Sequence, residues 1–231
     1  VQVFALKSQK NIETYSYVVN KKYDQFEIRH YEATLFSSVK LSGTTYKENS
    51  SEGFSVLAGY IFGNNERKEK IAMTSPVAMT LKDTSTMLFM VPKKFNKETL
   101  PQPNESKIKF QKEPAKTVAA IQFKGWANDK KIEKYKQKLI AALDKQGINH
   151  TNRVYFLGYN APYEVFNRKN EVIVELQKAG YKVIIIDNLE SIPETHQIEI
   201  IKFIESKLPP PSKVIYTTRT KFHRGYSTKI M

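Results

Sequence analysis

The 231-residue chain contains no cysteine. This absence excludes a disulfide framework, a thiolate metal site and a cysteine nucleophile, and it excludes the Cys-x-x-Cys-His motif that attaches haem covalently. The sequence also lacks any apolar run close to the roughly 18 residues of a membrane-spanning helix. A bound metal or prosthetic group would therefore be held without a thioether link.

Motifs of common enzyme classes are absent as well. The chain has no Gly-x-Ser-x-Gly elbow, no His-Glu-x-x-His helix and no glycine-rich phosphate loop ending in Gly-Lys-Ser/Thr. Glu27 and Glu32 fall at strand and turn positions, and the sequence places no second acid beside them. We therefore expect a protein that is not an enzyme.

Basic residues exceed acidic ones, and the formal net charge is +14. Nine basic and five acidic side chains lie in residues 177–231, so most of the excess is spread over residues 1–176. Such a charge suits anionic partners, but its even spread does not favour nucleic acid. We expect a soluble protein, cytoplasmic by default, and an exported one if a leader was removed before Val1. The oligomeric state is left open.

Residues 23–31 place an ionisable side chain in an apolar row. In a strand, alternate side chains point to opposite faces. Phe26, Ile28 and His30 then share one face, and Gln25, Glu27, Arg29 and Tyr31 share the other. The apolar face is expected to be buried, with His30 on it. A buried imidazole either finds a hydrogen-bond partner in the core or meets a bound group such as a metal centre.

The hydrophobic periodicity predicts strands, a helix, strands, a second helix and further strands. The first helix is expected at residues 51–62, with Gly63 as its left-handed stop, and the second from Asn128 or Asp129 to Gly147. The main strands are expected at residues 15–19, 23–31, 33–41, 71–79, 87–91, 107–110, 117–123, 154–159 and 171–176. This order is typical of an α+β fold with a largely antiparallel sheet.

Six short segments carry a family resemblance. They are FEIRHY at 26–31, MTSPV at 73–77, MVPKKF at 90–95, LPQPNE at 100–105, GYNAP at 158–162 and NRKNEV at 167–172. Over about residues 12–176 the sequence resembles the SOUL family of haem-binding proteins. The resemblance implies a distorted antiparallel β-barrel of two similar halves, each with a helix, that binds haem or another tetrapyrrole without a covalent link.

The resemblance also implies candidate site residues. Similar proteins carry a histidine in the first segment that has been proposed as an axial ligand, and His30 occupies that place. A tetrapyrrole needs a flat apolar cleft, which the first helix would form against the strands, and cations for its propionates. The candidate haem-binding residues are His30, Phe54, Leu57, Ile61, Lys47, Lys68 and Lys70, and His30 is the candidate metal ligand.

Residues 177–231 have a different pattern of predicted strands and helix from the rest of the chain. A buried strand ending at Asp187, a helix starting at Pro193 and a strand at residues 213–219 form a β-α-β unit. The segment resembles fragments of a nucleotide-sugar epimerase or of a signalling (STAND-type) NTPase. The phosphate-binding glycine loop of both is missing, so their chemistry cannot run here. We expect a haem-binding domain at residues 12–176 and an appendage or fusion fragment at residues 177–231.

Two other functions remain open on the sequence. The implied fold also resembles the effector-binding domains of transcription regulators, so a binding module for another amphipathic small molecule is one alternative. A nucleic-acid binder driven by charge is the other, and it predicts binding that weakens steeply with salt.

Overall fold

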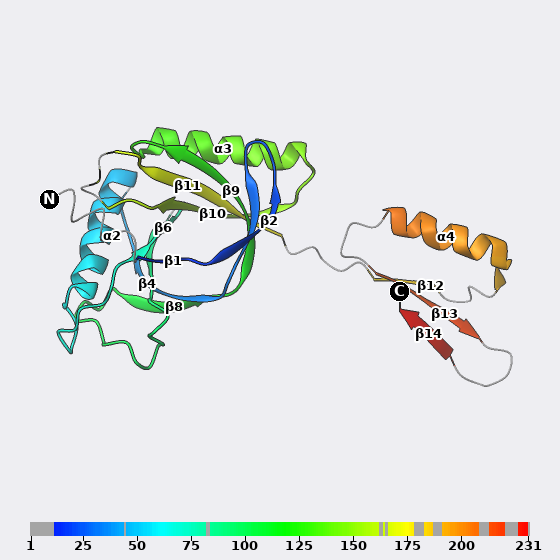
Figure 1. The fold of residues 1–231 in the computed structure, drawn as a ribbon, viewed down its shortest axis with the longest axis horizontal. Helices are drawn as coiled ribbons and strands as arrows, with labels where there is room; N and C mark the ends of the chain where they lie inside the picture. The colour runs from blue at the N-terminus through cyan, green and yellow to red at the C-terminus, as the bar shows by residue number, and fades with distance from the viewer. Residues whose placement is uncertain are drawn as a thin grey trace. The chain divides into compact units, whose positions relative to one another are not determined.

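A computed structural model of the protein describes residues 12–43, 45–81, 84–161, 164, 166–177, 183–186, 191–207, 213–219 and 226–230. The chain divides into two units, Val1–Leu176 and Gln177–Met231. Each unit has its own sheet (Figure 1). Within the part of the chain that the structure describes, no helix has the length and apolar character needed to cross a bilayer.

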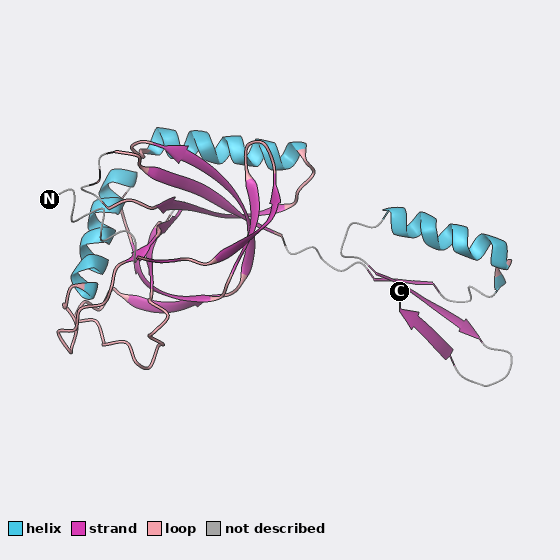
Figure 2. Cartoon of the chain, viewed as in Figure 1, coloured by secondary structure: helices cyan, strands magenta, loops and turns pink. Residues whose placement is uncertain are grey.

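The first unit is built on a nine-stranded antiparallel sheet that curls into a half-barrel (Figure 2). Its strands follow the order β2-β3-β9-β11-β10-β6-β7-β4-β8. The bounds are β2 Tyr17–Lys22, β3 Glu27–Tyr31, β4 Thr34–Lys40, β6 Val77–Thr80, β7 Thr86–Met90, β8 Lys109–Glu113, β9 Lys116–Lys124, β10 His150–Gly158 and β11 Lys169–Leu176. A separate parallel pair joins β1 (Glu13–Thr14) to β5 (Thr74–Ser75). The predicted α+β class with an antiparallel, barrel-like sheet is confirmed.

Two similar halves make up this sheet. One runs β4, α2 (Tyr46–Ile61), β6 and β7, and the other runs β9, α3 (Asp129–Lys145), β10 and β11. The halves meet where β6 pairs with β10. The strand that precedes each half pairs with the other half, because β3 pairs with β9 and β8 pairs with β4. This exchange of strands ties the halves into one sheet.

Helix α2 begins earlier than the predicted residue 51, because a capping box fixes its start. The Thr45 side chain accepts from the backbone N–H of Glu48, and the Glu48 side chain accepts from the backbone N–H of Thr45. Both bonds satisfy backbone donors that a helix N-terminus leaves unpaired. Gly63, with φ of +112°, ends the helix as predicted.

Helix α3 follows its prediction closely. The Asn128 side chain caps it by accepting from the backbone N–H of Lys131, and Gly147 follows its end with φ of +64°. Ile132, Leu139 and Leu143 are buried against the outer face of β9, β10 and β11. The long stripe of apolar residues thus makes the helix a lid on its half of the sheet.

Both faces of the central strands are covered. On β7, Met87 and Phe89 pack toward α2, while Leu88 and Met90 pack into the interior of the half-barrel. On β9, Ala119 packs toward α3 and Val118 into the interior, in the same alternation. The first unit therefore has an inner core and an outer core under each helix.

The second unit contains the predicted strand-helix-strand order. Strand β12 (Val183–Ile186) pairs in parallel with β13 (Lys213–Arg219), and α4 (Glu194–Lys207) lies between them in the chain. A further strand, β14 (Tyr226–Ile230), pairs antiparallel with β13 and was not predicted. Asp187, the acid on which the nucleotide-binding resemblances depend, lies outside the described residues.

Candidate functional site

His30 lies on β3 but not on a buried face. Phe26 and Ile28 pack in the core under α3, as predicted, whereas His30, two residues further along, is exposed. Its Nδ1 lies 3.2 Å from the Thr117 hydroxyl on the neighbouring strand β9. The prediction that His30 is buried is therefore wrong, because the core under α3 ends before this residue.

The opposite face of β3 carries buried charge instead. Arg29 is 5% exposed, and its guanidinium donates to the two carboxylate oxygens of Glu171 on β11 at 2.8 and 3.2 Å. The Tyr159 hydroxyl donates to the same carboxylate at 2.6 Å, and the Lys169 ammonium lies 3.2 Å from it. Glu171 itself is fully buried, so these neighbours, rather than water, stabilise its charge, and Arg29 also donates to the Glu27 carboxylate at 2.9 Å.

The protonation of this cluster follows from its contacts. Burial alone would raise the pKa of Glu171, but the hydrogen bonds and charge of Arg29 outweigh burial and lower that pKa. Burial and the adjacent carboxylate raise the pKa of Tyr159. At neutral pH the cluster therefore holds an ionised carboxylate and a neutral phenol, which suits a structural ion pair better than a proton-transfer site. The sequence did not reveal it, since Arg29 and Glu171 are far apart in the chain.

The predicted apolar stripe on α2 is mostly part of the core. Leu57 is fully buried and Ile61 is 5% exposed, and both pack against side chains of the sheet. Phe54 is partly buried, and its ring meets that of Phe89 at 5.5 Å with an angle of 61° between the planes. Protein side chains therefore fill the space at Leu57 and Ile61, and contact of all three with a ligand stays a prediction.

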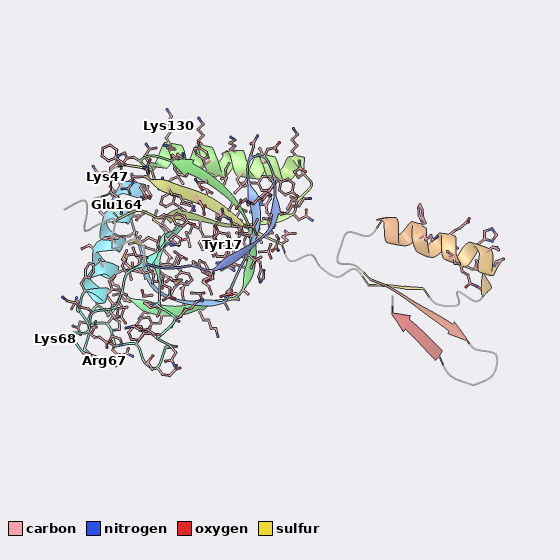
Figure 3. The ribbon with its side chains drawn as sticks, in the orientation of Figure 1. Tyr17, Lys47, Arg67, Lys68, Lys130 and Glu164 are labelled. Carbon is pink, nitrogen blue, oxygen red and sulfur yellow. The ribbon has the colours of Figure 1, made fainter. Side chains whose placement is uncertain are left out.

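The three candidate lysines are exposed but are not brought together. Lys47 lies in the first turn of α2, and Lys68 and Lys70 follow its C-terminal end; Figure 3 shows Lys47 and Lys68 at opposite ends of the helix. A 16-residue helix is about 24 Å long. His30 lies on β3, which pairs with β9 of the other half. The predicted residues thus occupy several surfaces of the first unit.

Two cavities lie elsewhere in this unit. One, of about 520 Å³, separates the turn between β2 and β3 from the C-terminal part of α3. The other, of about 190 Å³, is lined by polar side chains that include Gln111, Glu113 and Arg153. Among the described residues, no group of three or more His, Asp or Glu side chains is arranged to hold a metal ion.

Known proteins resemble this chain in both sequence and fold. Residues 12–175 match the model of the family described as SOUL heme-binding protein. The chain belongs to this family. Heme-binding protein 1 of Xenopus laevis is 29% identical over 155 residues, which cover 64% of this chain and 81% of the relative. Heme-binding protein 2 of Homo sapiens is 30% identical over 156 residues, covering 64% and 76%.

Solved structures support the fold of this SOUL-family chain at lower identity. The C-terminal domain of EcmrR superposes with a TM-score of 0.54 at 14% identity, covering 67% of this chain and 98% of that domain. A hydrolase from Listeria innocua gives 0.51 at 9% identity, covering 68% and 94%. At such identities the likeness concerns the fold alone.

Proposed function

We propose that this chain binds haem, or a closely related tetrapyrrole, non-covalently and without catalysing a reaction. The family match carries the proposal, since it spans the curled sheet and both of its helices. The relatives named above are heme-binding proteins over the same part of the chain. The absence of cysteine agrees with a ligand held by contacts rather than by thioether bonds.

His30 is the proposed axial ligand in this scheme. Its exposed ring is accessible, and the Thr117 hydroxyl at Nδ1 leaves Nε2 directed elsewhere. Histidines that bind metals commonly use their second ring nitrogen for a hydrogen bond that fixes the orientation of the ring. The pair His30 and Thr117 supports this arrangement for an iron approaching from solvent.

The surface of α2 is the proposed contact for the ring in an alternative scheme, which does not use His30, because β3 pairs with β9 of the other half. Phe54 reaches the surface, and Leu57 and Ile61 support it from the core beneath. Lys68 and Lys70 at one end of the helix, or Lys47 at the other, would then pair with the propionates. Each end of α2 supplies cations for one possible orientation of the ring.

A haemin titration tests the function, and two variants test the ligand. Wild-type protein is expected to give a saturable shift of the Soret band with one equivalent of haemin. His30→Ala is expected to change the position of that band if His30 ligates iron, whereas His196→Ala, which removes an exposed histidine of the second unit, leaves it unchanged. Absence of a saturable shift with wild-type protein would overturn the proposed function.

A further inference from the structure

Two neighbouring loops of the α3 half expose large aromatic side chains. Strands β9 and β11 are antiparallel, and Lys124 at the end of β9 pairs with Lys169 at the start of β11. The loop after β9 and the loop before β11 therefore lie side by side. Trp126 in the first loop is 54% exposed, and Phe166 in the second is 76% exposed. Apolar side chains exposed on adjoining segments, unlike scattered single ones, mark an interaction surface.

Contacts between the two loops fix the position of the Trp126 ring. The Arg168 guanidinium lies over this ring, 4.2 Å from its centroid, and it donates to two backbone carbonyls of its own loop. The Asn170 side chain donates to the Gly125 carbonyl at 2.7 Å, and the Gly125 N–H donates to the Arg168 carbonyl at 3.1 Å. Because the loops are already joined, less conformational entropy is lost when this surface binds a partner.

The surroundings of these rings are basic. Residues 124–134 contain four lysines and two acids, and residues 160–170 contain two basic residues and one acid, which leaves a net charge of +3. Each of the three acids already accepts hydrogen bonds from other groups of the protein. Lys124 and Lys130 are exposed, and in the part of the chain that the structure describes neither lies within ion-pair distance of a carboxylate. Their charges are available to an anionic partner.

We propose that this loop patch, made up of Trp126, Phe166, Lys124, Lys130 and Arg168, docks the protein on a membrane surface that contains anionic lipids. Tryptophan side chains are favoured at the level of the lipid headgroups, where the apolar part of the ring is buried and its N–H stays hydrated. Each basic residue near an anionic leaflet adds roughly fivefold to the affinity. Two protruding rings among cations combine both contributions, and no membrane-spanning segment is required.

The loop patch is separate from the proposed axial ligand. His30 pairs with Thr117, near the start of β9, whereas Lys124 ends that strand. Seven residues of strand, about 24 Å, separate the two positions. The membrane contact therefore does not use His30, and it does not rest on the proposed function.

Vesicle binding tests the membrane contact, and Trp126 reports it directly because it is the single tryptophan of the chain. Vesicles of phosphatidylserine and phosphatidylcholine in about a 1:3 ratio should sediment with the full chain and shift its emission to shorter wavelength. Phosphatidylcholine alone should bind at least about tenfold more weakly. Failure to sediment with the mixed vesicles, or sedimentation without a shift of the Trp126 emission, would overturn the proposal.

An aromatic substitution tests which part of the surface meets the lipid. Phe166→Ser removes the protruding ring of the loop patch and keeps Trp126 as the reporter. Phe62→Ser is the matched control, because Phe62 is 63% exposed at the C-terminal end of α2. Affinity for the mixed vesicles should fall about tenfold with Phe166→Ser and less than about twofold with Phe62→Ser. Equal affinities of the two variants would exclude insertion of the loop patch.

A charge reversal separates a local contact from a general effect of basic charge. One variant carries Lys124→Glu with Lys130→Glu, and Figure 3 shows Lys130 pointing away from the sheet. The control carries Lys138→Glu with Lys145→Glu, exposed positions further along α3, and changes the net charge by the same amount. We expect vesicle affinity to fall at least about tenfold in the first and less than about threefold in the control. Circular dichroism checks that both keep the fold. Equal losses would assign the binding to net charge and overturn the loop patch.

Discussion

The two halves of the curled sheet share a strand order but differ in their chemistry. In the α2 half, Leu57 and Ile61 are buried under a helix that contains one lysine. In the α3 half, the helix contains six lysines, and a cavity lies beside its C-terminal part. The comparison shows that a duplicated topology fixes where the cores lie, whereas the charge on the two covering helices is set by each half separately.

The interior of the half-barrel repeats this contrast. On the α2 side the inner positions are filled by apolar residues such as Phe36, Leu88 and Met90. On the α3 side, β11 brings the buried carboxylate of Glu171 to Arg29 of β3. An ion pair buried so completely is costly to form and more costly to break on one side only. Loss of a single charge from this pair should therefore destabilise the first unit.

Replacement of Glu171 by Ala is expected to have the largest effect on stability. It leaves the buried Arg29 with only the partly exposed Glu27 carboxylate, 2.9 Å from its Nε, so the cost should approach the lower end of the roughly 3–5 kcal/mol of a broken buried pair. Glu32→Ala is the control, because Glu32 is exposed and its ion pair with Lys93 contributes at most about 1 kcal/mol. Denaturant unfolding followed by the fluorescence of Trp126, the single tryptophan, measures both. A loss below about 1 kcal/mol for Glu171→Ala would contradict the contrast between the interiors.

The sequence predicted both helices and the antiparallel fold because these depend on local signals. Asn128 and Gly147 bound α3 as caps, and Gly63 ends α2, each through backbone geometry that the neighbouring residues set. The early start of α2 was missed, although Thr45 and Glu48 carry the spacing of a capping box. Reading that box would have corrected the boundary.

Site residues were harder to predict because their partners are distant in the chain. The alternation in β3 was read correctly, but α3 covers its outer face only as far as Ile28, while the curled sheet covers the inner face that carries Arg29. The buried polar group of β3 is Arg29, and its face is buried because it pairs with Glu171. No local sequence pattern reveals this pairing. The cavity likewise joins the turn after Lys22 to α3, more than a hundred residues later. In the sequence, its aromatic pair, Tyr23 and Phe26, was recognised only as part of a predicted strand.

The buried phenol of Tyr60, in the α2 half, should make the free energy of unfolding depend on pH in the alkaline range. Burial raises the pKa of Tyr60 to about 12, and its hydroxyl donates to the Pro101 carbonyl at 2.8 Å. A phenol with a raised pKa in the folded state stabilises the fold fully below about pH 10, and this contribution is lost as pH rises toward 12, by up to about 1.4 kcal/mol per pH unit.

Comparison with Tyr60→Phe isolates this contribution. At pH 9 the variant should be less stable by about 1 kcal/mol, because it lacks the hydrogen bond to Pro101. Unfolding free energies measured at pH 9, 10 and 11 should then show the difference shrinking above pH 10. A difference that stays constant up to pH 11 would argue against a closed environment for this phenol.

Two glycines of α2 test how tightly this helix lies on the sheet. A Cβ at Gly53 would lie 3.0 Å from atoms of Leu41 and Met87, whereas a Cβ at Gly59 would meet nothing within 4 Å. Gly53→Ala should therefore cost about 1–3 kcal/mol through overpacking. Gly59→Ala should stabilise by about 0.5–1 kcal/mol, because alanine has the better helix propensity. Equal effects in thermal unfolding would mean that α2 does not pack as closely as described.

The smallest expected effect concerns the joint between the halves. The backbone N–H of Tyr46, at the start of α2, donates to the Asp129 carboxylate at the start of α3, at 2.6 Å. One carboxylate thus serves the N-terminal ends of two helices, where the helix dipole favours negative charge. Because the bond is exposed, Asp129→Ala should cost only about 1 kcal/mol.

A double-mutant cycle tests whether Asp129 couples α2 to α3 or serves only one helix end. Asp129→Ala combined with Thr45→Ala removes two groups that serve the first turn of α2, so their effects should differ from additivity by about 0.5 kcal/mol or more. Asn128 caps α3 alone, so the effect of Asn128→Ala should add to that of Thr45→Ala. Additivity in both cycles would mean that the two halves meet at these helix ends without stabilising each other, and that the β6–β10 pairing and the exchanged strands β3 and β8 hold them together.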